Sequence, residues 1–145
     1  MSLRVQPVDF NQDGSPRDPR LYGAVQEYAK SALGEELFFA YYAKVWATVL
    51  CEDGGKMQII GLLGTRAAID VCMFHVTPPS QDREGMRVAE AARDAMHARM
   101  RSYLEDLGHT GNIVLVYVSE TAERFWRRFL GKIGARPANR YEIKV

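Results

Sequence analysis

Cysteine is scarce in this chain of 145 residues, and neither sign of charge is in excess. The two cysteines, Cys51 and Cys72, lie far apart in apolar, strand-like segments. This is typical of reduced core thiols in a reducing compartment and argues against a disulfide framework. Lysine and arginine total 19, against 18 for aspartate and glutamate. Because clustered basic residues supply most non-specific affinity for phosphate backbones, this balance argues against a dedicated nucleic-acid binder.

Long apolar runs are absent as well. No stretch approaches the roughly 20 residues that span a bilayer, and Leu3–Gln6 alternates apolar and polar side chains where a signal peptide would be basic and then apolar. We therefore expect a cytoplasmic protein with no membrane partner. Histidine is rare too, and neither His97 nor His109 has a Cys, His or carboxylate at metal-ligand spacing, so we expect no metal site.

Apolar residues make up 47% of the chain, which fits one compact domain over residues 1–145 with a single core. Pro7 favours a sheet edge for the first strand, because an edge tolerates a missing backbone donor. The segment Glu35–Lys44 is either a short helix, which we favour, or an extended lead into the next strand. The remaining patterns of the first half predict a strand at Leu3–Val8, a helix from Asp18-Pro19 to Gly34, a hairpin of Val45–Glu52 and Met57–Leu63 around Asp53-Gly54-Gly55, and a strand at Ile69–Thr77.

The second half predicts helices and strands in alternation. Apolar residues at spacings of three and four predict a long helix over Gly85–Leu107, and the continuous apolar run Ile113–Val118 predicts a central strand buried on both faces. A helix over Ala122–Ile133 and a last strand at Arg140–Val145 follow. The predicted fold class is α/β with a mixed α+β sheet: an antiparallel meander, then a parallel β-α-β crossover through the long helix, with helices on both faces.

A ligand is expected where the crossover helix begins. In open α/β sheets, ligands bind beyond the carboxyl ends of parallel strands, which points to Phe74–Gly85. The unpaired N–H groups and positive dipole end of a helix start attract phosphate, and a glycine lets the backbone approach it. Neither a G-x-x-x-x-G-K-[ST] nor a G-x-G-x-x-G stretch is present, so a small nucleotide or phosphate binder is the weaker interpretation.

Several segments carry a family resemblance over roughly residues 45–145. The stretch from Ile69 to Val76-Thr77-Pro78 is similar to a fourth strand ending in V-x-P, and Ser119-x-x-Ala122-x-x-Phe125-Trp126 is similar to N-x-x-A-x-x-F-Y. Ile133-Gly134-Ala135 with Tyr141-Glu142-Ile143 is similar to L-G-F followed by a closing strand, and Asp53-Gly54-Gly55-Lys56 matches a hairpin turn. In this order the chain resembles a divergent member of the GNAT superfamily of acetyl-CoA-dependent N-acetyltransferases.

The resemblance implies a GNAT-like fold and direct attack of an amine, from a small molecule or a protein, on the thioester of acetyl-CoA, with both substrates bound together. The chain departs from the family's R/Q-x-x-G-x-G/A phosphate loop, because Asp82 stands where Arg or Gln is usual and Arg87 where Gly or Ala is usual. Trp126, or Leu130 in an alternative register, stands where the family has the tyrosine that usually protonates the departing thiolate. The residues implied to contact the cofactor are Phe74, His75, Val76, Arg83, Glu84, Gly85, Met86, Arg87 and Trp126.

His75 and Asp70 are the candidates for the general base, and Tyr117 is a third catalytic candidate. The residue types alone favour a structural role for both: His75 as a packed or hydrogen-bonded histidine, and Asp70 as a residue near the strand start. Tyr41 and Tyr42 are candidates for an acceptor pocket, since aromatic walls suit ammonium groups, although core packing explains them as well.

The alternative function is a catalytically weak or inactive GNAT-fold module for binding or assembly. The sequence leaves the acceptor and the oligomeric state open, and a homodimer is compatible with it.

Overall fold

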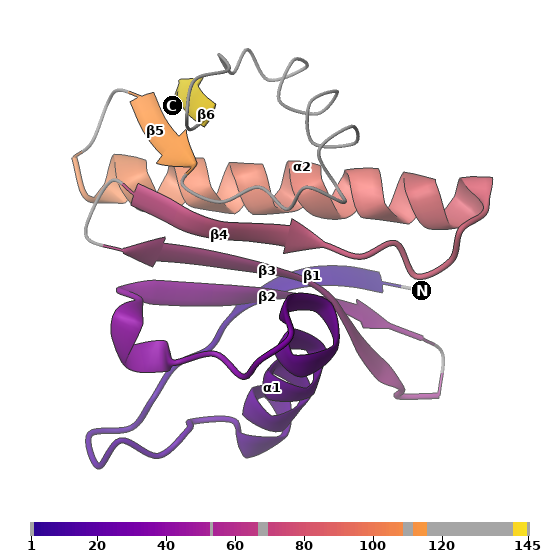
Figure 1. The fold of residues 1–145 in the computed structure, drawn as a ribbon, viewed down its shortest axis with the longest axis horizontal. Helices are drawn as coiled ribbons and strands as arrows, with labels where there is room; N and C mark the ends of the chain where they lie inside the picture. The colour runs from indigo at the N-terminus through magenta and orange to yellow at the C-terminus, as the bar shows by residue number, and fades with distance from the viewer. Residues whose placement is uncertain (1, 53, 67–69, 109–111, 116–140, 145) are drawn as a thin grey trace.

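A computed structural model describes residues 2–52, 54–66, 70–108, 112–115 and 141–144. These residues form one six-stranded sheet in the order β1-β2-β3-β4-β5-β6, with β4 and β5 parallel and every other described pair antiparallel. Figure 1 shows helix α1 against one face of the sheet and helix α2 along the other. The elements are β1 (Ser2–Pro7), α1 (Pro19–Leu33), the 3₁₀ turn η1 (Phe39–Tyr41), β2 (Lys44–Cys51), β3 (Met57–Arg66), β4 (Asp70–Val76), α2 (Arg83–Asp106), β5 (Asn112–Leu115) and β6 (Tyr141–Lys144).

The sheet follows the predicted plan. Strand β1 is an edge and pairs with β2, which places Pro7 where its missing donor is tolerated. The hairpin β2–β3 turns through Gly54 and Gly55, whose φ angles of 100° and 83° favour glycine. The parallel pairing of β4 with β5 confirms the crossover. The described part of β5 lies between β4 and β6, one position in from the edge.

Both helices of the described residues begin at aspartate caps. The Asp18 side chain accepts a hydrogen bond from the Leu21 N–H, and α1 ends at Gly34, with φ of 88°. Helix α2 begins at Arg83, two residues before the predicted start, because Asp82 caps it. The segment 35–44 contains the single turn η1 in place of the short helix favoured from its sequence. The helix predicted over Ala122–Ile133 lies outside the described residues.

Each helix builds a core on its own face of the sheet. Val25 and Ala29 of α1 pack with Met73 of β4, whereas Met96 and Met100 of α2 belong to the cluster that holds Phe74 and Val76. Met96 and Met100 are completely buried, and burial of each contributes about 2 kcal/mol from the hydrophobic effect. Because side chains alternate along β4 from Met73 onwards, His75 lies on the α1 face.

No described helix is long and apolar enough to cross a membrane.

Candidate functional site

The site is built at the carboxyl end of β4. His75 is the second-to-last residue of this strand and Thr77 follows its end, while Tyr28 reaches both from the third turn of α1. Strand β3 supplies the carbonyl of Ile60, which accepts the Thr77 N–H at 2.7 Å. Three elements therefore meet at one group of polar atoms, on the side of the sheet that α1 covers.

The Tyr28 hydroxyl is the centre of this group. Its oxygen lies 2.8 Å from His75 Nδ1, 2.8 Å from Thr77 Oγ1 and 3.2 Å from the Ile60 carbonyl oxygen. The Tyr28 and His75 rings also meet edge to face, with centroids 5.8 Å apart and planes at 71°. These contacts fix the orientation of the imidazole relative to the strand end.

Both titratable groups of the site are neutral near neutral pH. Burial raises the pKa of Tyr28 to about 12, so its phenol keeps its proton. Burial lowers the pKa of His75, because the charged imidazolium loses hydration. A neutral imidazole has a lone pair that can accept a proton, so His75 satisfies the first chemical requirement of a general base.

The start of α2 is closed by the chain's own groups. Asp82 Oδ1 accepts hydrogen bonds from the Gly85 N–H at 2.8 Å and from the Ser80 hydroxyl at 2.7 Å. The hydrogen bond from Ser80, and to a lesser extent the one from the Gly85 N–H, holds the pKa of Asp82 below its usual range. The carboxylate therefore stays ionised. The N–H group that a phosphate would use at this helix start is thus already bonded to a negative charge.

Gly85 has a local structural explanation. A Cβ placed on Gly85 would lie 2.0 Å from the Ser80 carbonyl oxygen, which leaves no room for a side chain. Arg87 forms an ion pair with Glu84 on the same helix turn, while Arg83 and Met86 are exposed. Of the residues expected to contact the cofactor here, Gly85 lies in a closed turn, whereas the side chains of Arg83, Met86 and Arg87 are exposed at the rim of that turn.

The other predicted site residues are distributed over the fold. The side chains of Phe74 and Val76 face the α2 core and are only 2% and 6% exposed. Asp70 begins β4 and His75 lies near its end, so the structure does not bring the two base candidates together. The pairing of β3 with β4 shifts register opposite Cys72, which interrupts the regular alternation along β4 between Asp70 and His75. Tyr117 and Trp126 lie outside the described residues.

The tyrosine pair lies toward the opposite end of the sheet from Thr77. A Cβ on Gly64 would lie 2.9 Å from the Tyr42 ring, so this glycine lets the ring pack against the strand. Gly64 pairs with Met73, the middle residue of β4, and Figure 1 shows η1 near the amino end of that strand. Tyr41 packs edge to face on Tyr42 and is 48% exposed. An acceptor role for this pair stays a prediction.

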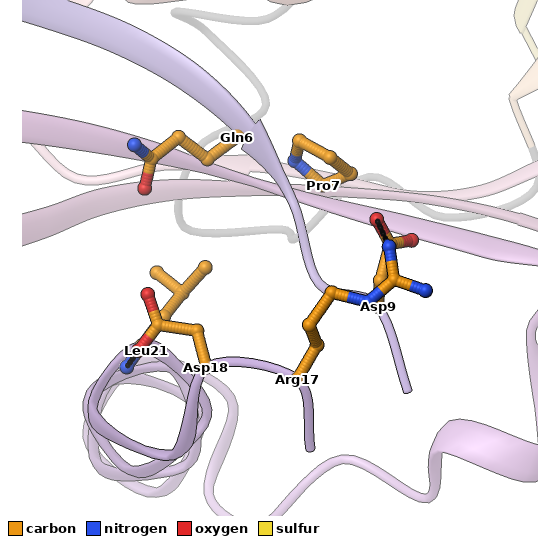
Figure 2. Close-up of a pocket in the computed structure, with 6 residues that line it drawn as sticks. All are labelled: Gln6, Pro7, Asp9, Arg17, Asp18 and Leu21. Carbon is orange, nitrogen blue, oxygen red and sulfur yellow. Dashed lines mark hydrogen bonds and ion pairs between the residues drawn. The ribbon is translucent and has the colours of Figure 1, made fainter. Parts of the chain in front are cut away.

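A hollow of about 230 Å³ lies between the end of β1 and the start of α1. Figure 2 shows Arg17 and Asp9 directed toward one another at its rim, beside the helix cap Asp18. Asp9 also accepts a 2.6 Å hydrogen bond from Lys44. Local sequence patterns do not indicate this hollow, because its walls come from β1, a loop and α1. The lining residues are Gln6, Pro7, Asp9, Arg17, Asp18 and Leu21.

Tyr28 is the site residue that sequence reasoning missed. It lies on α1 between the buried residues Val25 and Ala29, and its spacing alone does not separate a ring that only packs from a ring whose hydroxyl also forms hydrogen bonds in the site. Among the residues that the structure describes, no group of three His, Cys, Asp or Glu side chains could hold a metal ion.

Comparison of the chain with protein-family models, curated proteins and solved structures found no match.

Proposed function

We propose that this protein transfers an acetyl group from acetyl-CoA to an amine, with His75 as the general base. The observation that supports this most strongly is a neutral, oriented histidine at the carboxyl end of β4, the strand that leads into a parallel β-α-β crossover. In open α/β sheets this is the position where ligands bind. Part of the family resemblance, the V-x-P strand ending, lies on the same residues.

In the proposed reaction both substrates bind together and no covalent enzyme intermediate forms. His75 takes a proton from the acceptor ammonium, directly or through one water, and the freed amine attacks the thioester carbonyl. The new carbon–nitrogen bond forms, the carbon–sulfur bond then breaks, and the thiolate leaves with the electron pair and takes up the second proton of the amine nitrogen, directly or through solvent. The backbone of Phe74–Val76 would hold the pantetheine arm, and a backbone N–H there would stabilise the developing oxyanion.

The pyrophosphate would have to be held at the rim of the α2 start. Arg83 and Arg87 provide the positive charge, although Arg87 is paired with Glu84. Asp82 would lie beside the phosphates and already uses the Gly85 N–H. The residues therefore fit a cofactor bound through arginine side chains better than one cradled by backbone N–H groups.

One specific observation favours a second function. The capped and closed start of α2 is what a module that binds or assembles without turnover would tolerate, because such a module needs no phosphate site.

Titration calorimetry with acetyl-CoA, followed by a CoA-release assay over a panel of amines, separates the two functions. Acetyl transfer predicts binding and amine-dependent CoA release, and His75→Gln should lower that release by about a hundredfold or more. His97→Gln, a histidine on α2, serves as the matched control. Absence of binding at millimolar acetyl-CoA would exclude the enzymatic proposal, whereas amine-dependent release of CoA would exclude the inert module.

A further inference from the structure

The hydrogen-bond capacity of the Tyr28 hydroxyl restricts how the site is protonated. A phenol has one hydrogen to donate and two lone pairs that accept. Its three neighbours are the Ile60 carbonyl oxygen at 3.2 Å, His75 Nδ1 at 2.8 Å and Thr77 Oγ1 at 2.8 Å. A carbonyl oxygen can only accept, so the assignment that satisfies all three contacts gives the phenol hydrogen to Ile60. The two lone pairs then accept from His75 Nδ1–H and from the Thr77 hydroxyl.

This assignment determines the tautomer of His75. With hydrogen on Nδ1, the lone pair of the neutral ring is on Nε2. When Nε2 takes up a proton, Nδ1 remains a donor and each bond to Tyr28 is kept. The Ile60 carbonyl accepts from Tyr28 and from the Thr77 N–H, which uses both of its lone pairs. The network is therefore the same before and after the histidine gains a proton.

We propose that Tyr28 is a positioning residue that holds His75 in the Nδ1–H form and presents Nε2 to the attacking amine. The role rests on the proposed function, in which His75 is the base. The burial that raises the pKa of Tyr28 to about 12 supports it, because the phenol then keeps the hydrogen that Ile60 receives. Tyr28 belongs to α1, whereas the resemblance assigned the phenolic role to the last helix, where this chain has Trp126.

A rival arrangement makes the opposite prediction. If Tyr28 donates its hydrogen to His75 Nδ1, the ring carries hydrogen on Nε2 and its lone pair is already bonded. A proton could then reach the ring only after the phenol hydrogen turns away from Nδ1. The 2.8 Å contact with Nδ1 is shorter than the 3.2 Å contact with Ile60 and allows this arrangement by distance alone, so it must be tested.

Nitrogen NMR of the histidine rings decides between the two arrangements without any substrate. In protein labelled with ¹⁵N-histidine, long-range proton–nitrogen spectra above the pKa of His75 report which ring nitrogen carries hydrogen. The signals of His75 are identified by their loss in His75→Gln. We expect a protonated Nδ1 and an unprotonated Nε2. The reverse pattern would overturn the proposal.

Tyr28→Phe tests the cause, because it keeps the ring and removes the hydroxyl. We expect the neutral His75 to change from mainly Nδ1–H to mainly Nε2–H, and its pKa to fall further because the imidazolium loses an acceptor. Tyr22→Phe is the matched control on the same helix, since its hydroxyl bonds to Gln26 and not to the site. An unchanged His75 tautomer in a folded Tyr28→Phe protein would also overturn the proposal.

Kinetics then separate this inference from the proposed function. If amine-dependent CoA release is found, Tyr28→Phe should lower the rate less than His75→Gln does and should move the acid limb of the pH–rate profile to lower pH, while Tyr22→Phe should leave that limb in place. If no release is found, the acetyl-transfer proposal fails, yet the NMR result still decides whether Tyr28 sets the tautomer.

Discussion

Helices α1 and α2 begin in the same way, and their surroundings differ. Asp18 caps α1 through the Leu21 N–H at 3.1 Å, and Asp82 caps α2 through the Gly85 N–H at 2.8 Å. The start of α1 borders a hollow (Figure 2), whereas the start of α2 is packed under Ser80. Asp82 and Gly85, three residues apart, therefore indicate a helix cap at least as strongly as a phosphate site. Local packing against Ser80 alone accounts for the glycine.

The largest effect should come from filling the closed turn. Gly85→Ala places a Cβ against the Ser80 backbone, which cannot move as a flexible side chain would, and we expect a loss of about 2 kcal/mol or more in the free energy of unfolding. Gly23→Ala in α1 meets open space, so it should stabilise the protein by about 0.5–1 kcal/mol. Urea unfolding of both variants measures the contrast. Equal changes in the two helices would show that the turn at Ser80 is not closed in solution.

A smaller effect is expected on ligand affinity. Asp82→Asn retains a capping side chain but removes the negative charge beside the proposed pyrophosphate, so acetyl-CoA should bind about two- to fivefold more tightly. Asp18→Asn makes the same change at α1 and should leave the affinity unchanged. Calorimetry at low salt measures both. A weaker or unaltered affinity in Asp82→Asn would place the phosphates away from the start of α2.

The sequence predicted the fold well where periodicity and turn residues act locally. The structure confirms the α1 helix from Asp18 to Gly34 and the hairpin around Gly54-Gly55. Both were predictable because helix caps and positive φ angles depend on the type of a single residue. The parallel neighbour of β4 followed from the rule that a helix crossover joins parallel strands. These signals need no knowledge of which distant residues touch.

The site was less predictable, because its contacts join distant parts of the chain. His75 was identified from its place at the strand end, but its partner Tyr28 is 47 residues away and fits an apolar stripe equally well. The capping of α2 by Asp82 was foreseeable from residue type, whereas the Ser80 carbonyl over Gly85 depends on the path of the loop. Pairings of this kind are set by tertiary packing, which local patterns do not encode.

The smallest effect is a pH dependence that involves one histidine on each side of the sheet. Burial lowers the pKa of His75 beside α1, and burial together with Arg101 lowers the pKa of His97 on α2. In the unfolded chain both titrate near the ordinary value of about 6.5. Below about pH 6.5, and down to the lowered pKa values of the folded protein, the unfolded chain binds more protons than the folded protein does. The contribution of the two neutral histidines to the free energy of unfolding is therefore complete above about pH 6.5 and is lost as the pH falls from about 6.5 through those lowered pKa values.

Urea unfolding across this window should therefore show stability that falls with acid, by less than about 1.4 kcal/mol per pH unit for each histidine. His75→Gln and His97→Gln should each remove a part of the slope, and the double variant should remove nearly all of it above the range where carboxylates titrate. If His97→Gln alone abolished the slope, His75 would titrate normally, and the buried, neutral histidine on which the proposed chemistry depends would be excluded.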